Sequence, residues 1–587
     1  MKQRLMRRTR IGACCPALPL IISACLAANT AVLARDVYVS PAGNDADAGT
    51  RAAPFEKIGT AVSKAEPGDR VVLRPGTYRG TVRISKSGAP EKPITIVSES
   101  ADESEYAVID GGYPEGWDAY YLKPGMPTKK STNHGFVVSD SAWLVFENLV
   151  LKNCYFIGFK LEDANYITVR GCRFYGAGRA VETNGKGTHH ILLEHNEWQP
   201  MPNDALFEQL EWKEGKHGRY RYMAQGSIFF VNVTGGGGSV IRYNETRNAF
   251  NSLQMWPDAG MQHGDNIEIY GNRFGRSLDN VYEPERWVFN QHFYHNTLEG
   301  YKGCMIVSIQ SVGGGPLWFY GNVCHSGRLI WKMNYQTNVP PYFSEVFHCY
   351  HNTFDNGEGV NHDRSFKHWH HCNNIYDMRM GMRNWPPSFM SQVDNHFDYD
   401  CTTVDWPDVI KADKQEQHGL ANTDPQFVDK RGRDYRLKRS SPCIDAGRVI
   451  PGFTQAYEGR APDMGAYEGD KLVEGPPFHT MVPTGGLLYA ERPRITRHRV
   501  KGTVLTVFFS WPLRPTTLSA RTVNLTVNER PARIRRALVG RNRRELRIVA
   551  AQDLTNAELA LRFDPLPVGE NGAPATHWAS TLPVAGR

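Results

Sequence analysis

A short phrase recurs nine times between Asn148 and Asn374: two or three apolar or aromatic residues that alternate with others, and then an asparagine or its substitute. Clear copies end at Asn196, Asn272 and Asn322, and Cys172 fills one slot. Successive marks lie 22 to 30 residues apart, except for one step of 48, which we interpret as two coils with one faint mark. This period constrains the fold more than any other feature of the chain.

A period in the twenties, built from short alternating strands and turn residues, is typical of a solenoid whose units bury their apolar sides by stacking. Helical repeats are longer, and leucine-rich repeats need leucine at fixed offsets. Aromatic and β-branched strands with an asparagine at the turn favour an all-β, right-handed parallel β-helix. The asparagine side chains are predicted to bond backbone groups of neighbouring coils, so most of them hold turns and do no chemistry.

Segments on both sides of the repeats carry a resemblance to a known group. The N-terminal ones are 36–45, 53–55, a helical stretch that ends at Ala65, and 67–78; the closing ones are 424–427, 434–437, 441–447 and 463–468. Together they resemble secreted right-handed β-helix proteins, which include pectate-lyase-like and chondroitinase-B-like polysaccharide lyases. The resemblance implies a short helix that caps the solenoid. It does not select a reaction, because the group contains lyases, hydrolases, epimerases and proteins without known activity.

The two ends of the chain differ from this solenoid. Residues 1–34 read as a signal peptide, with basic residues before an apolar run and a cleavage site at 32–34. An alternative cleavage box ends at Cys25 and would leave a lipid anchor there. Residues 35–140 are expected to form the cap and first coils, 141–474 the main body and closing segment, and 475–587 a small β-sandwich. The strand-like runs of this last part are similar to bacterial Ig-like domains.

The charge of the chain is unevenly distributed. The formal net charge is +7, but the leader holds five basic residues and no acidic one, so residues 35–587 carry only +2. Residues 481–587 carry +10, which leaves the solenoid at −8. A mildly acidic solenoid argues against nucleic acid as its partner. No stretch after the leader is apolar enough to span a bilayer. We expect an exported monomer, periplasmic or extracellular or an outer-membrane lipoprotein.

Chemistry in a filled solenoid must lie on its outer surface. Counted from the asparagine, positions 9 and 11 are apolar and are predicted to face inward, so positions 10 and 12 face outward in stacked rows. We interpret this stripe as a sugar-binding groove, or else as a solvated sheet face. The outward residues that we assign to substrate binding are Lys160, Asn184, Gln254, Trp256, Gln310 and Asn334.

Glu283 breaks the inward pattern, because it is the carboxylate in a column of apolar residues. A buried carboxylate is costly, so either a bulge turns it outward or a cation compensates it. With Asp279 and Glu285 it supplies oxygen ligands suited to Ca²⁺. The alternative is a turn held by a salt bridge through Arg286.

Two enzymatic hypotheses compete for the stripe. β-Elimination on a uronic acid polymer, an acidic polysaccharide, needs a cation that neutralises the carboxylate and a base that removes the C5 proton. Lys332, His362, Arg364 and Tyr282 supply these groups, with Lys302 as an extra candidate base. Glycoside hydrolysis needs two carboxylates about 5–9 Å apart, which Glu285 and a neighbour would provide. Uronate epimerisation and non-catalytic glycan binding are the further alternatives. Lyase activity is the leading prediction.

Overall fold

The structure is a computed structural model, and it describes most of the chain between residues 34 and 582. The described ranges are 34–112, 133–154, 157–185, 187–200, 204–213, 229–231, 238–255, 264–265, 267–289, 291–302, 304–314, 317–333, 347–357, 369–379, 395–451, 453–454, 456–474, 495–509, 523–528, 530–539, 545–555, 557, 559–563 and 579–582. Backbone contacts divide the chain into Met1–Ala34 and Arg35–Arg587. All that follows concerns the second unit.

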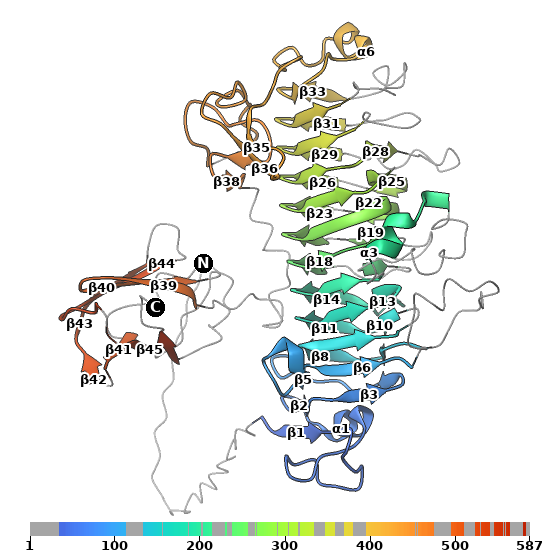
Figure 1. The fold of residues 1–587 in the computed structure, drawn as a ribbon, viewed down its shortest axis with the longest axis vertical. Coiled ribbons are helices and arrows are strands. Elements are labelled where there is room, and N and C mark those ends of the chain that lie inside the picture. Colours follow the sequence, from blue (N-terminus) through green and yellow to red (C-terminus); the bar gives the residue numbers. More distant parts are fainter. Residues whose placement is uncertain are drawn as a thin grey trace, which may run out of the picture. The chain divides into compact units, whose positions relative to one another are not determined.

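Stacked coils build the main body, and each coil contributes one strand to a 13-stranded parallel sheet (Figure 1). We call this sheet A. Its strands, in spatial order, are β1 (Asp36–Val39), β2 (Arg70–Leu73), β5 (Ile94–Ser98), β8 (Ala142–Glu147), β11 (Asn165–Arg170), β14 (His189–Glu194), β17 (Val240–Arg242), β21 (Glu268–Tyr270), β23 (Gln291–Tyr294), β26 (Leu317–Tyr320), β29 (Phe347–Tyr350), β31 (Trp369–Cys372) and β33 (His396–Asp398). The order in space follows the order in sequence, as a β-solenoid requires.

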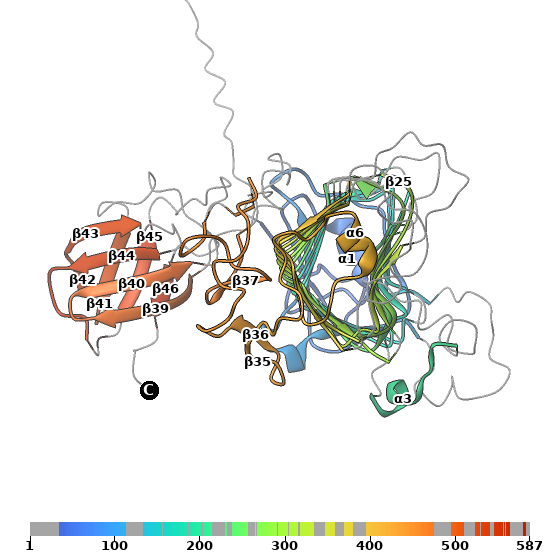
Figure 2. The ribbon, with the colours of Figure 1, turned by 90° about the horizontal axis from the view of Figure 1, so that it is seen from above.

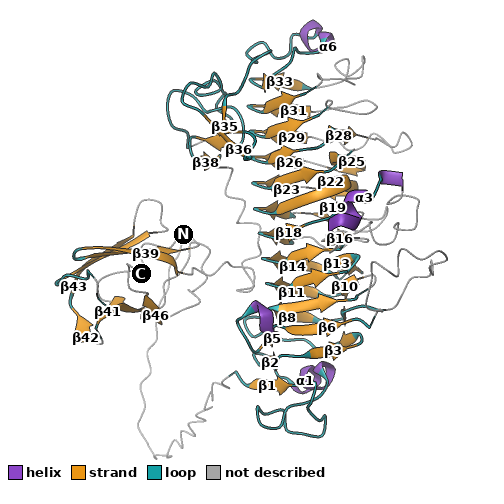
Figure 3. Ribbon diagram, viewed as in Figure 1, coloured by secondary structure: helices purple, strands orange, loops and turns teal. Residues whose placement is uncertain are grey.

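The other sides of the coils form a 21-stranded sheet, which we call sheet B (Figure 3). Its strands are β3 (Thr77–Arg79), β4 (Val82–Ile84), β6 (Ala107–Asp110), β7 (Phe136–Ser139), β9 (Leu149–Lys152), β10 (Ile157–Glu162), β12 (Arg173–Tyr175), β13 (Arg179–Asn184), β15 (Glu197–Gln199), β16 (Phe229–Val231), β18 (Glu245–Thr246), β19 (Ala249–Met255), β20 (Gly264–Asp265), β22 (Arg273–Phe289), β24 (Thr297–Gly300), β25 (Met305–Gly314), β27 (Val323–His325), β28 (Leu329–Met333), β30 (Thr353–Asn356), β32 (Ile375–Met378) and β34 (Cys401–Thr402). The predicted parallel β-helix is confirmed.

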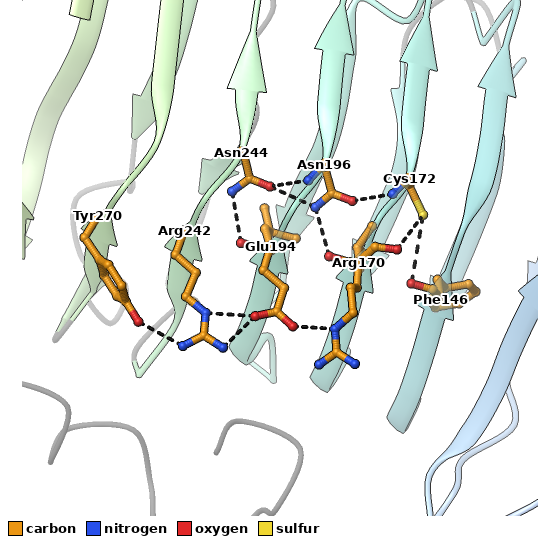
Figure 4. A network of polar contacts seen from close by, with 10 residues as sticks. Phe146, Arg170, Cys172, Glu194, Asn196, Arg242, Asn244 and Tyr270 are labelled. Carbon is orange, nitrogen blue, oxygen red and sulfur yellow. Dashed lines mark hydrogen bonds and ion pairs between the residues drawn. The ribbon is translucent and has the colours of Figure 1, made fainter. Parts of the chain in front are cut away.

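The asparagine phrase forms a continuous hydrogen-bonded ladder. The backbone N–H and the side-chain amide of Asn272 both donate to Oδ1 of Asn296, at 3.0 and 2.9 Å, and the same pair of bonds repeats along the stack. The rungs are Asn196, Asn244, Asn272, Asn296, Asn322, Asn352 and Asn374, and Oδ1 of Asp400 continues them. Cys172 takes the preceding slot, where its N–H donates to Asn196 (Figure 4). The ladder satisfies the buried polar groups of the turn.

The residue before each rung lies in the left-handed region. Its φ is 55° at His195, 55° at Tyr243 and 65° at Gly271, and this conformation turns the chain between the two sheets. A Cβ added to Gly271 would come within 2.6 Å of the Tyr243 ring, so the turn that follows Tyr243 in the stack requires glycine. Asn148 belongs to this column of turns, with φ 57°, and pairing of Glu147 with Arg170 aligns it with Gly171. Its use as a ladder mark was therefore wrong by one residue.

The interval of 48 residues is one coil with an insertion. Both donors of Asn196 bond Oδ1 of Asn244 directly, and β14 pairs with β17. The two-coil interpretation was therefore wrong. The excursion carries α3 (Asp204–Gln209), which projects from the side of the stack (Figure 2). Arg276 of β22 anchors α3 through ion pairs to Asp204 and Glu208.

The interior of the coils is a continuous apolar core, and both ends of the stack are covered. Phe293 stacks on Phe319 with ring centroids 5.2 Å apart, one step of the stack. The predicted capping helix is confirmed as α1 (Ile58–Lys64), which buries Ile58 against the first coils. At the other end α6 (Asp408–Ala412) buries Ile410. The end-on view of Figure 2 shows both helices within the outline of the coils.

Two further parts follow the last coil. The closing segment contains β35 (Phe427–Asp429), β36 (Asp434–Leu437), β37 (Tyr467–Glu468) and β38 (Lys471–Leu472), and it packs on the coils through bonds such as Tyr435 to Asp355. The C-terminal part has two four-stranded antiparallel sheets that share one apolar core. Their strands are β39 (Ile495–Lys501), β40 (Val504–Phe509), β41 (Val523–Val527), β42 (Arg530–Ala532), β43 (Ile534–Val539), β44 (Glu545–Ala550), β45 (Leu559–Phe563) and β46 (Ala579–Leu582). This arrangement is a β-sandwich; its Ig-like kinship and the domain boundaries remain predictions.

Within the described ranges, no helix is both long enough and apolar enough to cross a membrane.

Candidate functional site

A column of polar residues runs along sheet B at the predicted stripe. Lys160 pairs with Glu182, and through β16 the column continues to Gln254 and then to Glu283. Ser308 and Lys332 are paired neighbours at its far end. We call these six residues the polar column. Gln254, Lys160 and Lys332 are half-buried, whereas the other three are buried. The predicted stripe thus exists, but it is less open than the sequence suggested.

A bulge changes the register between β19 and β22. Ala249 pairs with Ser277 but Asn251 pairs with Asn280, so β22 contains one extra residue. Tyr282 therefore lies beside Leu253 in the interior, where its ring stacks on Phe293 at 4.2 Å. The outward orientation predicted for Tyr282 is wrong. Its burial raises the pKa of its hydroxyl further above the ordinary range, so Tyr282 is unsuited to act as a base.

The same bulge moves Glu283 out of the inward column and next to Gln254, which is the first of the two solutions that the sequence allowed. Glu283 is still only 2 % exposed. Its two carboxylate oxygens accept from the side-chain amides of Asn251, at 2.7 Å, and Asn280, at 3.1 Å. These two amides stabilise the buried carboxylate. The Arg286 side chain lies outside the described residues, so the salt bridge through Arg286 stays a prediction.

The described atoms around Glu283 do not fit a calcium site. Asp279 Oδ1 accepts from the indole N–H of Trp212 at 2.6 Å, and the Glu283 oxygens accept from amides, so N–H donors point at the oxygens that a cation would need. Across the described ranges, no three acidic, histidine or cysteine side chains converge in a manner suited to a metal ion. The side chain of Glu285, the third predicted ligand, lies outside the described residues.

The N-terminal half of the polar column is tied up by ion pairs. Lys160 Nζ contacts Glu162 at 2.6 Å, and Glu182 is held by Arg179 and by the amide of Asn184 at 2.7 Å. Asn184 pairs with Glu162 in the backbone register. In the N-terminal half of the polar column, the side chains of Lys160 and Asn184 are therefore already bound to neighbouring carboxylates.

Lys332 differs from the other lysines of the predicted site. It is half-buried on β28, and its ammonium forms no hydrogen bond or ion pair with any residue that the structure describes. Lys302 is instead committed to structure: its Nζ donates to the carbonyls of Glu208 and Leu210 and to the Glu211 carboxylate, at 2.7–2.9 Å. Lys302 thus caps the end of the α3 insertion, and these contacts disfavour it as a base.

The remaining predicted residues cannot be placed as side chains. His362, Arg364, Trp256 and Asn334 lie outside the described residues. Gln310 and Glu285 pair with each other through the backbones of β25 and β22, but their side chains also lie outside the described set.

The outer face of sheet A carries an ordered set of polar and aromatic residues that the sequence analysis missed. Buried Glu194 bridges Arg170 and Arg242, and Arg242 donates to the Tyr270 hydroxyl (Figure 4). Burial alone would raise the pKa of Glu194, but the two arginines lower it to about 2. A parallel column lies four residues before each ladder rung, so the same register marks would have identified it: Glu268, His292, Trp318, His348, His370 and His396.

Comparison with known proteins gives matches for the first part of the solenoid. Residues 37–201 match the family model described as Pel9A-like, right handed beta helix region. Pectate lyase PEL9 of Emericella nidulans is 44 % identical over 197 residues, which are 32 % of this chain and 45 % of that protein. Pectate lyase L of Dickeya chrysanthemi is 20 % identical over 199 residues, 32 % of this chain and 43 % of that protein. The chain thus spans less than half the length of these relatives.

A solved structure, that of pectate lyase Pel9A, covers 74 % of this chain and 97 % of its own, at 17 % identity and a TM-score of 0.43. The family match and the strand order agree on the same architecture for the N-terminal coils. Residues 37–201 are therefore similar to the Pel9A-like right-handed β-helix region, and the predicted resemblance to pectate-lyase-like β-helix proteins is confirmed.

Proposed function

We propose that the protein is a polysaccharide lyase that cleaves a uronic-acid-containing polysaccharide by β-elimination on sheet B. Three observations support this proposal: the Pel9A-like match over 37–201, the similarity over 197 residues to a pectate lyase, and the polar column that ends at Lys332. The single observation on which it rests most is the half-buried Lys332, whose ammonium is not engaged by any described residue.

In the proposed reaction, a base removes the C5 proton of the uronate, the electron pair forms the C4–C5 double bond, and the glycosidic oxygen leaves from C4. Lys332 is the proposed base, and its amine accepts the C5 proton. Gln254, which is half-buried in the same column, offers an amide that bonds hydroxyls of the sugar. Arg364 and His362 are the proposed neutralisers of the substrate carboxylate.

Calcium remains a component to be tested, not a step in this scheme. A cation bound with the substrate would supply neutralisation of the carboxylate. The atoms at Asp279 and Glu283 are hydrogen-bonded to N–H donors, so we do not assign a calcium ion to them.

The test of this function identifies the product of the reaction and then compares variants of the proposed base. The full chain is incubated with pectate, alginate, glycosaminoglycans and neutral glycans, with Ca²⁺ or with EDTA, while ultraviolet absorbance of unsaturated uronate and new reducing ends are followed. Elimination produces both signals. Reducing ends without absorbance would assign hydrolysis instead, inversion at C5 without either signal would assign epimerisation, and retention of glycan without reaction would assign a binding protein.

The Lys332→Ala variant is expected to reduce the rate at least roughly tenfold, equivalent to about 1.4 kcal/mol of transition-state stabilisation. Lys160→Ala is the matched control, because Lys160 lies in the same column but is paired with Glu162. Equal activity of the two variants would place the base elsewhere.

We propose further that residues 1–34 direct export and that the mature protein is periplasmic or extracellular. The leader pattern supports this placement, and cleavage before Cys25 with lipid attachment is the alternative. Mass spectrometry of the mature N-terminus distinguishes them: a chain that starts at Arg35 supports the free form, and a lipidated Cys25 supports the anchored form.

A further inference from the structure

A cavity of about 530 Å³ lies on the outer face of sheet A, at the C-terminal end of the coils. Its floor is formed by β29, β31 and β33, from which Tyr350, His370 and His396 line it. One wall is the closing segment at 448–451, and the other is the chain at 414–417 that follows α6. The volume is that of a site for a small ligand.

The charge of the described lining is net positive. Lys414 and Arg448 are both exposed, and neither side chain forms a hydrogen bond or ion pair with a residue that the structure describes. The backbone of Arg448 is fixed, because its N–H and its carbonyl both bond the Asn373 side chain at 2.7 Å. The one carboxylate in the described lining, Asp398, already accepts from the imidazole and the backbone N–H of His418, both at 2.8 Å. The described lining therefore carries two cations against one carboxylate, and neither cation is ion-paired with Asp398.

The uncharged lining suits a sugar ring. The His370 imidazole lies edge-on between those of His348 and His396, with ring centroids 5.3 and 5.0 Å away. Together with Tyr350, His370 and His396 line the cavity with aromatic rings on which a sugar can pack. Gln415 accepts the Phe397 N–H at 2.7 Å through its side-chain oxygen, which fixes the amide at the wall of the cavity. Gln417 adds a second amide. Rings, fixed amides and two unpaired cations together match a carboxylated pyranose better than an apolar ligand.

We propose that this cavity is a binding site for a uronate unit of an acidic polysaccharide, separate from the polar column of sheet B. Arg448 and Lys414 bind the carboxylate, the histidine column packs against the ring, and Gln415 and Gln417 bond hydroxyls. The site holds the polymer on the protein but performs no chemistry. It stands on its own residues and does not depend on Lys332 or on the proposed elimination.

The test is retention of the full chain in native gels that contain an acidic polymer, either polygalacturonate or alginate, or a neutral galactan. All variants carry Lys332→Ala, so that the polymer is not degraded if the chain is a lyase. Lys414→Ala with Arg448→Ala is compared with Lys438→Ala with Arg439→Ala, a pair that removes the same charge from exposed residues of the closing segment that do not line the cavity. Circular dichroism and unfolding temperature confirm that each variant is folded.

The Lys414→Ala/Arg448→Ala pair is expected to weaken the affinity for acidic polymer at least tenfold. The Lys438→Ala/Arg439→Ala control pair is expected to leave this affinity unchanged. In the chain that retains Lys332, the cavity pair is expected to leave turnover of short soluble oligouronates unchanged. Equal retention of the two pairs in the acidic polymer would overturn the proposal. Retention of the protein by galactan as strong as by the acidic polymer would also overturn it. Competition by inorganic phosphate as strong as that by glucuronate would show a general anion site, and would also overturn it. If the cavity pair loses retention and the parent chain shows no activity on any polymer, the binding site is supported and the proposed lyase activity is contradicted.

Discussion

At the scale of single residues, burial and partners set the charge of two glutamates that lie on the same face of sheet A. Glu194 lies between two arginines, and its pKa falls to about 2. Glu268, 2 % exposed, accepts only from the Tyr294 hydroxyl at 3.3 Å; its other oxygen, Oε1, has no hydrogen-bond partner among the described residues. Burial raises the pKa of Glu268 to about 7. The same side chain is thus an anion in one column and a neutral acid in the next.

Glu268 gives a prediction about pH. Its pKa in the folded state lies above the ordinary value of 4.5, so the folded chain binds an extra proton between pH 4.5 and 7. The free energy of unfolding must therefore fall as the pH rises through this window, by roughly 3–4 kcal/mol for this group. Asp400, whose pKa burial also raises to about 7, adds a contribution of the same sign. Glu268→Gln is expected to flatten the pH dependence, as measured by denaturant unfolding at pH 5 and pH 8.

Glu162→Gln is the control for this measurement. Glu162 contacts Lys160 at a partly exposed position. Its substitution is therefore expected to change the pH dependence of the free energy of unfolding very little. A Glu268→Gln protein with the slope of the parent chain would show that this carboxyl is ionised in the folded state.

Single residues also show the limit of sequence analysis at the candidate site. The alternation rule placed Lys160, Gln254 and Lys332 in one column, and the strand register agrees through the pairs of β10, β13, β16, β19, β25 and β28. It failed at Tyr282 and Glu283, because one extra residue in β22 reverses the parity of the positions that follow it in that strand. A bulge is specified by hydrogen bonds between coils, which no local pattern records.

At the scale of elements, the asparagine ladder and the turn before it act as one device. Each rung accepts two bonds from the preceding rung, and each turn residue adopts a positive φ that aims its neighbour into the ladder. Left-handed turns favour glycine and asparagine, and histidine and tyrosine occur here where the next coil leaves room. The recurring asparagine in the sequence therefore reflects the same turn conformation in each coil.

Asn296→Ala tests the ladder. The substitution removes the acceptor of two buried donors on Asn272 and the donor to the Ile269 carbonyl, so it leaves buried polar groups without partners. The expected loss in the free energy of unfolding is about 2–4 kcal/mol, measured by denaturant titration. Asn165→Ala is the control: this asparagine is half-buried, donates from its side chain to the Gly187 carbonyl at 3.3 Å, and is expected to cost less than about 1 kcal/mol. Equal losses would mean that the ladder is incidental to stability.

At the scale of the whole molecule, the chain has separate apolar cores. The solenoid core extends from Val37 to Ile410, and the C-terminal sandwich has its own, which includes Leu505, Leu525 and Ile548. Separate cores predict separate cooperative units, since each buries enough apolar surface to fold on its own.

Ile548→Ala is expected to lower one calorimetric transition and to leave the other in place. The side chain is fully buried in the sandwich core, and its truncation costs about 2–4 kcal/mol. Ile306→Ala, at an equally buried position of the solenoid core, is the matched variant and should lower the other transition. A single transition that moves with both variants would show that the two parts unfold together.

The sequence by itself determined the parallel β-helix, its asparagine ladder, the capping helix and the column that ends at Lys332, because each of these follows from local periodicity or turn chemistry. The tertiary structure alone decided that 196–244 is one coil and that Tyr282 faces the core. It also brought Arg448, Lys414 and His370 around one cavity from three distant segments. Register between coils and contacts across long loops depend on hydrogen bonds and packing between residues far apart in the chain, and these are fixed only when the coils stack.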